Sequence, residues 1–120
     1  HQRMKSVAES IASSMGGSCN FEIKKGYPFL INDPELTEEL IQAATDYLGK
    51  ENVEELEIWM AAEDFAFYSQ IMPASFYRLG VRNEEKGIVS PVHTTTFDID
   101  EDALKIGMGL MAWLTISQLA

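Results

Sequence analysis

The sequence predicts an α/β domain in which helices alternate with short strands. Two patterns lead to this prediction. Stretches with apolar residues at helical spacing recur along the chain, and stretches of alternating apolar and polar residues lie between them. Because strands that alternate with helices pack as layers, this order favours a layered architecture. With 120 residues, of which 46% are hydrophobic, the chain is long enough to bury a core.

The first two predicted helices carry clear start or stop signals. Apolar residues from Met4 to Met15 form one stripe at helical spacing, and Gly16-Gly17 follow, which tolerate the positive φ that ends a helix. A second helix is predicted from Pro34 to Leu48. Asp33 can cap its first turn, and proline is well suited to the first helical position because its missing N–H would be unpaired there.

A third helix is predicted over about Ile99–Leu119. Asp98 and Glu101 have the spacing of a capping box, in which the two side chains bond the free N–H groups of the first turn. The helix is apolar almost all round, so we expect it to be buried. Its apolar run, Ile106–Ile116, is too short to span a bilayer.

Three strands and one short helix complete the predicted elements. Apolar and polar residues alternate over Cys19–Ile23, and again over Leu56–Met60, while Phe76–Val81 reads as a further strand. A short helix is expected over Glu63–Tyr68. One helix and one strand cannot enclose a core, so residues 1–26 should belong to a larger layer.

Composition excludes several classes of function. The net charge is −10 and no basic cluster interrupts it, so nucleic acid and anionic membranes are not expected partners. The single cysteine, Cys19, excludes an internal disulfide and is consistent with a reducing, cytoplasmic location. The sequence contains no pattern from which we would expect a signal peptide or a transmembrane segment. The chain begins at His1, without an initiator Met and inside a helical pattern, which leads us to expect a fragment.

Two short stretches could carry chemistry. His93 lies in the loop that leads into the last helix, and such a loop can hold an imidazole in place for a metal. One histidine does not make a metal site, so a solvated loop histidine is the alternative. Glu63 and Asp64 lie where a strand meets a helix; acids in a first turn are commonly caps or partners of the helix dipole.

Taken together, three motifs resemble a known family. They are Tyr27-Pro28 followed by Asn32-Asp33-Pro34-Glu35-Leu36, then Met60-Ala-Ala-Glu-Asp-Phe-Ala-Phe-Tyr68, and then His93 followed by Phe97-Asp-Ile-Asp-Glu101. Their order and spacing resemble the C-terminal part of the metal-dependent amidohydrolases that include hippurate hydrolase, aminoacylase-like enzymes and the indole-acetyl-amino-acid hydrolases. The resemblance covers essentially the whole chain. It departs from the pattern at Thr94–Thr96 and Ala61, where relatives usually carry Asn or Ser followed by Pro, and Gly, respectively.

The resemblance implies a division into two parts. Residues 1–27 correspond to the last helix and strand of a lid or dimerisation domain of ferredoxin-like topology. Residues 28–120 correspond to the C-terminal part of a zinc-peptidase-like catalytic domain. It further implies a homodimer, and pairing of the exposed strand edge at 18–26 is the expected mode of self-association.

The resemblance also implies an active centre with two divalent metal ions: zinc, manganese, cobalt or nickel. These ions polarise the amide carbonyl of an N-acyl amino acid and lower the pKa of a bridging water. His93 matches the family's C-terminal metal ligand, and Glu63 and Asp64 match the substrate wall or its supporting shell. The other ligands and the general base belong to the missing N-terminal part, so the chain alone should be inactive and bind no metal tightly. The alternative is a non-enzymatic ferredoxin-like binding or dimerisation module.

Overall fold

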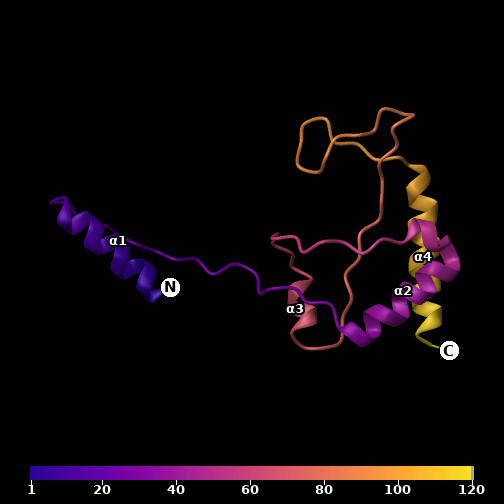
Figure 1. Cartoon of the computed structure of the whole chain (residues 1–120), viewed down its shortest axis with the longest axis horizontal. Coiled ribbons are helices and arrows are strands. Elements are labelled where there is room, and N and C mark those ends of the chain that lie inside the picture. The colour runs from indigo at the N-terminus through magenta and orange to yellow at the C-terminus, as the bar shows by residue number, and fades with distance from the viewer. Residues whose placement is uncertain (120) are drawn as a thin grey trace.

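The computed structural model describes residues 1–119, which form four α-helices and one short 3-10 helix joined by extended segments (Figure 1). The radius of gyration is 21.0 Å, whereas a compact domain of this length has about 14 Å. The molecule is therefore open rather than globular. The helices are α1 (Gln2–Ser14), α2 (Pro34–Leu48), η1 (Lys50–Asn52), α3 (Ala66–Ser69) and α4 (Asp102–Ser117).

The core lies between α2 and α4, which pack side by side (Figure 1). Ala43 of α2 and Leu110 and Leu114 of α4 are buried against one another. The indole N–H of Trp113 donates to the Ala43 carbonyl at 2.9 Å. Tyr47 stacks on the Trp113 ring at a centroid distance of 6.3 Å. A Cβ at Gly109 would overlap the Tyr47 hydroxyl, so the glycine permits this close approach.

Hydrogen bonds at the start of α2 fix a segment that is distant from it in the sequence. As predicted, the Asp33 side chain caps the helix by accepting from the Leu36 N–H at 3.0 Å, and Pro34 is the first helical residue. The Asn32 side chain pairs with the backbone of Phe76 through two hydrogen bonds of 2.8 and 3.0 Å. The Asp33 N–H donates to the Ala74 carbonyl at 2.8 Å. Residues 74–76 are therefore fixed beside the beginning of α2.

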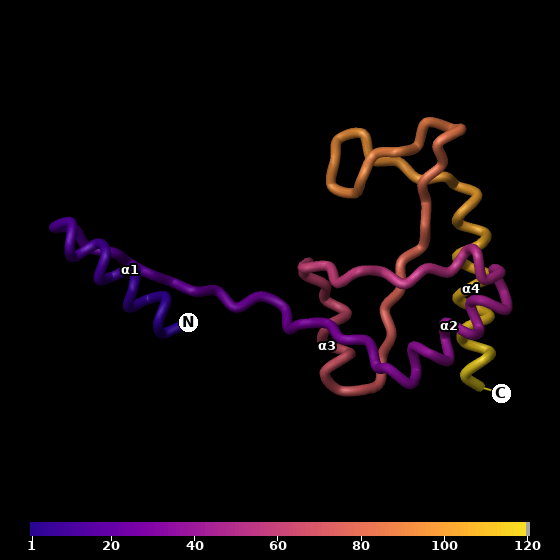
Figure 2. Tube along the Cα trace, in the orientation of Figure 1, coloured from indigo at the N-terminus to yellow at the C-terminus, as the bar shows by residue number. Residues whose placement is uncertain are grey.

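Helix α1 lies apart from this body, at the end of an extended connection (Figure 2). It ends where the glycine pair was predicted to end it: Gly16 has φ +74° and the Gly17 N–H donates to the Ala12 carbonyl at 2.9 Å. None of the residues of α1, all of which the structure describes, is buried. The apolar stripe that predicted the helix is exposed along its length.

The strand predictions are wrong for this structure. Within residues 1–119 there is no β-strand, and the only β-bridge joins Asn83 and Ile88. The segments Cys19–Ile23, Leu56–Met60 and Phe76–Val81 have no ladder partner among the described residues. A strand needs a neighbour for its backbone N–H and C=O groups, and alternation of side chains does not supply one. The sheet of the predicted α/β architecture is therefore not formed here.

The predicted burial of the last helix is also wrong. Ala103, Leu110 and Leu114 are buried, but Leu104, Met108 and the other large apolar residues of α4 remain exposed. The exposed face lines an open apolar groove together with Tyr77 and Leu79. The total accessible surface is 10275 Å², whereas a compact chain of this size exposes about 6,500 Å². None of the helices within residues 1–119 has the length and apolar character needed to cross a bilayer.

Candidate functional site

His93 lies in a tight turn of the loop that connects residues 83–88 to α4, and it is exposed to solvent. Its φ is +66°, the only positive value among the non-glycine residues that the structure describes. A side chain in this left-handed region clashes with its own backbone, at a cost of about 1–2 kcal/mol. Such strain is characteristic of residues that a functional role holds in place.

The loop around His93 is closed by its own polar groups. The hydroxyls of Ser90 and Thr96 share a hydrogen bond of 2.8 Å across its neck. The Thr94 hydroxyl donates to the Pro91 carbonyl at 2.8 Å, and so spans the histidine. These hydrogen bonds give the loop a defined shape. The exposed His93 imidazole lies at a bend between Pro91 and Thr94, which are bonded to each other.

Both ends of this loop are fixed to the same short segment, residues 81–83. Asn83 and Ile88 exchange two backbone hydrogen bonds of 2.8 and 2.9 Å at the entrance. At the exit, the Asp100 N–H donates to the Val81 carbonyl at 2.9 Å. Because one segment holds both ends, the loop leaves and returns to the body at a single place.

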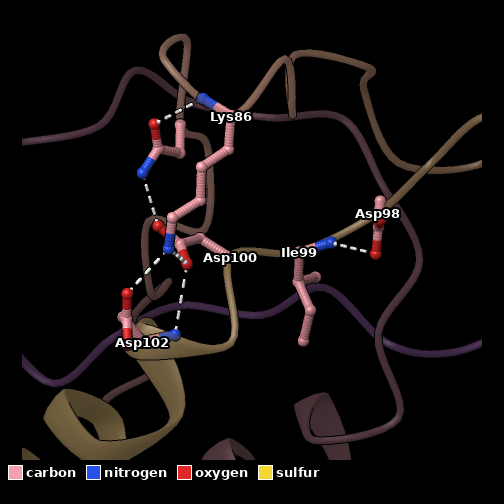
Figure 3. A network of polar contacts seen from close by, with 6 residues as sticks. Lys86, Asp98, Ile99, Asp100 and Asp102 are labelled. Atoms are coloured by element: carbon pink, nitrogen blue, oxygen red, sulfur yellow. Dashed lines mark hydrogen bonds and ion pairs between the residues drawn. The ribbon is translucent and has the colours of Figure 1, made fainter.

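A network of side chains ties the turn before the loop to the first turn of α4 (Figure 3). The Lys86 ammonium lies 2.6 Å from Asp100 Oδ1 and 2.7 Å from Asp102 Oδ2. The Asn83 side-chain amide donates to Asp100 Oδ2 at 2.6 Å. Asp100 also accepts from the backbone N–H of Asp102 at 3.2 Å. Asp100 is the centre of the network, and its side chain is only 13% exposed.

This arrangement stabilises the charged forms of both partners. The hydrogen bond from Lys86, followed by that from Asn83, lowers the pKa of the Asp100 carboxyl to about 2. Hydrogen bonds to Asp100 and then Asp102 raise the pKa of Lys86 above its usual range. The ion pairs are therefore fully charged at neutral pH.

The predicted capping box at the start of α4 is wrong. Glu101 is the N-cap residue but makes no side-chain cap hydrogen bond, and Asp98 Oδ1 accepts from its neighbour Ile99 at 2.8 Å. The acceptor that reaches into the first turn is Asp100, on the Asp102 N–H. The Asp100 N–H is bonded to the Val81 carbonyl outside the helix, and α4 begins at Asp102, three residues later than predicted.

Glu63 and Asp64 lie in a turn immediately before α3. Glu63 is half-buried and its Oε1 accepts from the Phe65 N–H at 3.3 Å, whereas Asp64 is exposed. Figure 1 shows α3 well apart from the orange loop that leads into α4. The structure does not bring these acids together with His93.

The described residues offer one candidate metal ligand and not a complete set of ligands. Nowhere in residues 1–119 do three His, Cys, Asp or Glu side chains gather as they would around a metal ion. An exposed imidazole on a fixed loop is a suitable single donor. A complete site needs three or four protein ligands, which the described residues do not bring together.

Comparison with known proteins identifies the family. The sequence profile of the peptidase family M20/M25/M40 matches residues 4–116. The chain belongs to this family. Proteins of the M20/M25/M40 family are metal-dependent hydrolases, which agrees with the sequence resemblance to the metal-dependent amidohydrolases.

Relatives of this M20 chain include hydrolases from distant organisms. Thermostable carboxypeptidase 2 of Saccharolobus solfataricus is 35% identical over 114 residues, which are 94% of this chain. IAA-amino acid hydrolase ILR1-like 6 of Arabidopsis thaliana is 43% identical over 86 residues, or 72% of this chain. The matched segments span 28% and 18% of the lengths of these two relatives. No solved structure matches the chain.

The network around Asp100 is what the sequence interpretation missed in this M20 chain. No functional role was predicted from the sequence for the turn Asn83–Gly87 or for Asp100. A signal was present, because Asn83 and Gly87 are turn residues and the run between them contains one cation, Lys86, close to an acidic helix start. Contact between Lys86 and Asp100 depends on the turn folding back, which no local pattern specifies.

Proposed function

We propose that this chain is part of a metal-dependent amidohydrolase that hydrolyses the amide bond of N-acyl amino acids or similar small amides. Membership of the M20/M25/M40 family supports hydrolysis, and the relative named as an IAA-amino acid hydrolase supports this substrate class. The observation that carries the proposal is His93, an exposed imidazole held in a strained conformation on a closed loop.

We assign His93 the role of one metal ligand in a centre with two divalent ions, of zinc, manganese, cobalt or nickel. In such a centre the metals supply polarisation of the carbonyl and activation of water. The part played by this chain is to hold an imidazole nitrogen at a fixed place. The remaining ligands and the general base would come from the part of the polypeptide that precedes this chain in longer relatives.

Glu63 and Asp64 are assigned to the wall of the substrate pocket or to the shell that supports it. The Glu63 carboxylate is half-buried and bonded to the backbone of its own turn, which is how a supporting acid is kept in one orientation. In the assembled enzyme their turn would face the same cleft as His93. Glu63→Gln should therefore lower kcat or raise KM while leaving the metal content unchanged.

Residues 1–27 are assigned to the end of a lid or dimerisation domain of ferredoxin-like topology, and residues 28–120 to the catalytic domain. Helix α1 has an apolar stripe with no partner within residues 1–119, and the 18–26 segment has unpaired backbone groups. Both would be covered in a lid sheet and at a homodimer interface. A monodisperse monomer of the complete protein in light scattering would contradict the dimer.

The central experiment uses the complete gene product that carries this chain. We expect purified protein to contain divalent metal by elemental analysis and to hydrolyse members of a panel of N-acyl amino acids. His93→Ala should lose bound metal and activity, while the matched control His1→Ala, the other histidine of the chain, should keep both. Full metal content in His93→Ala would overturn the ligand assignment, and activity on none of the N-acyl amino acids would overturn the substrate class.

The 120-residue chain by itself should neither bind metal tightly nor be active, because one imidazole supplies too few ligands for a metal centre. Elemental analysis of the purified 120-residue chain is expected to give metal far below one ion per chain. A stoichiometric, tightly bound ion would show that the described residues complete a site on their own. It would contradict the division of ligands between two parts of the polypeptide.

A further inference from the structure

We propose that Lys86 is a positioning residue for His93: it clamps the 83–88 turn to the start of α4 and thereby fixes the loop that presents the imidazole. This inference rests on the proposed function, because it gives the loop a role only if His93 binds metal. It concerns a residue that touches neither His93 nor a substrate. Its effect would pass through the geometry of the loop.

The geometry of the loop base supports this role. Ile88 and Asp100, the two ends of the loop, are held by backbone bonds to residues 81–83. Lys86 reaches from the turn to Asp100 and Asp102, so it joins the entrance of the loop to its exit (Figure 3). Without that link, the two ends would remain joined by three backbone hydrogen bonds and by the hydrogen bond from the uncharged Asn83 amide to Asp100.

The position of Lys86 within the turn is itself fixed. Its backbone N–H donates to Asn83 Oδ1 at 3.1 Å, while the Asn83 amide nitrogen donates to Asp100. Gly87, with φ +72°, allows the turn to close immediately after the lysine. The turn is thus shaped so that Lys86 and Asn83 converge on the same carboxylate.

A second ion pair beside this turn serves as a comparison. Arg82, immediately before the turn, and Glu84, within it, lie 3.0 Å apart, and both side chains are largely exposed. That pair does not reach α4. Loss of Arg82 therefore removes one positive charge next to the same turn without removing a contact to Asp100 or Asp102.

The expected effect is local rather than global. Exposed ion pairs contribute little to overall stability, so loss of Lys86 should leave the unfolding midpoint of the protein nearly unchanged. A loop whose ends can separate, however, no longer holds its ligand at one place before the metal arrives, and this preorganisation matters for binding. Metal affinity and loop order should therefore change while stability does not.

The test uses four variants of the complete gene product: Lys86→Met, Lys86→Arg, Arg82→Met and His93→Ala. After removal of metal by a chelator, each protein is titrated with Mn²⁺ and with Zn²⁺, and binding is measured by calorimetry. Hydrogen exchange of residues 88–100 is followed by mass spectrometry in the metal-free proteins. Thermal unfolding of every variant shows whether the fold is intact.

We expect Lys86→Met to weaken metal binding by about 3- to 10-fold, less than the 10- to 100-fold typical of losing a group bonded directly to a ligand. Exchange in residues 88–100 should become faster in the same variant. Lys86→Arg should restore both properties in large part, because arginine keeps the charge and can span two carboxylates. Arg82→Met should match the unsubstituted protein.

The outcomes separate this proposal from the proposed function. If His93→Ala loses metal but Lys86→Met binds it normally, the clamp is wrong and the ligand assignment stands. If His93→Ala binds metal normally, the ligand assignment is wrong, and with it the role given to Lys86. If Lys86→Met and Arg82→Met weaken binding equally, the effect is one of surface charge, which also overturns the clamp.

Discussion

Helices α1 and α2 have similar apolar stripes, yet only one of them is packed. Helix α2 buries Ala43 against Leu110 and Leu114 of α4, while α1 buries no residue at all among those described. Both stripes predicted their helices correctly from spacing. The difference shows that amphipathic spacing specifies a helix and its apolar face, but not the partner that covers the face.

The ends of the two helices differ in the same way. The start of α2 is capped by Asp33 and bonded to residues 74–76, whereas α1 begins at His1 with no side-chain cap. Helix α2 is thus stabilised by its own side-chain cap and by hydrogen bonds to a segment that is distant in the sequence. Helix α1 depends on its own backbone hydrogen bonds. Isolated helices of this length are marginal in water, so α1 needs a covering surface to be stable.

The largest expected difference between the two regions is in truncation of apolar side chains. Leu110 is 4% exposed and Ile11 is 58% exposed. Leu110→Ala should lower the free energy of unfolding by about 2–3 kcal/mol, because it removes buried methyl groups and leaves a cavity. Ile11→Ala should change it by less than about 0.5 kcal/mol. Urea unfolding of the 120-residue chain, followed by circular dichroism, measures both.

Equal effects of these two substitutions would contradict the comparison. A large loss in Ile11→Ala would mean that α1 is buried in solution, by another copy of the chain or by the rest of the molecule. Repeating the measurement at several protein concentrations distinguishes a second copy, because only association makes the midpoint depend on concentration.

A smaller difference is expected at the helix caps. Asp33→Ala should destabilise the chain by about 1 kcal/mol, because the Leu36 N–H loses its acceptor at the start of a packed helix. Asp46→Ala is the matched control, since its side chain bonds only the exposed Gln42 side chain. In α1, His1→Asp should add a cap and raise helicity while leaving the urea midpoint unchanged. A shift of that midpoint would show that α1 unfolds together with the body.

The fold could be predicted where the information is local. The Asp33 cap, the proline start of α2 and the Gly16-Gly17 stop of α1 each depend on neighbouring residues, and all three are confirmed. The strands were not predictable in this way. Residues 56–60 alternate as a strand should, but their pairing requires a second strand at the right register, and the described residues offer none.

The same limit applies to the candidate site. His93 could be singled out from the chain, because it precedes a helix start and matches a family motif. Its left-handed backbone could not, since positive φ at a histidine follows from how Thr94 and Pro91 close the turn around it. Asp98 was predicted as the cap by spacing alone. In the structure the later carboxylate, Asp100, accepts from the first turn, and it is bonded to Lys86, 14 residues away in the sequence.

The smallest expected effect is the protonation of the ion-paired carboxyl group in the body as pH falls. In the body, Lys86 and Asn83 hold the pKa of Asp100 at about 2, below its ordinary 3.8. A depressed carboxyl pKa adds stability that is present above the ordinary value and is lost as pH falls from about 4 through 2, and the contribution is small here because the Lys86 side chain is half-exposed. The Asn83 side-chain amide signal in nuclear magnetic resonance should therefore titrate with a midpoint near 2. In Lys86→Met the midpoint should rise toward 3.8.

Helix α1 offers the control, because its Lys5–Glu9 pair is looser at 3.8 Å and Lys5→Met should leave the Asn83 midpoint unchanged. An Asn83 midpoint near 2 in Lys86→Met would mean that the lysine does not hold Asp100, and the clamp would then have no basis.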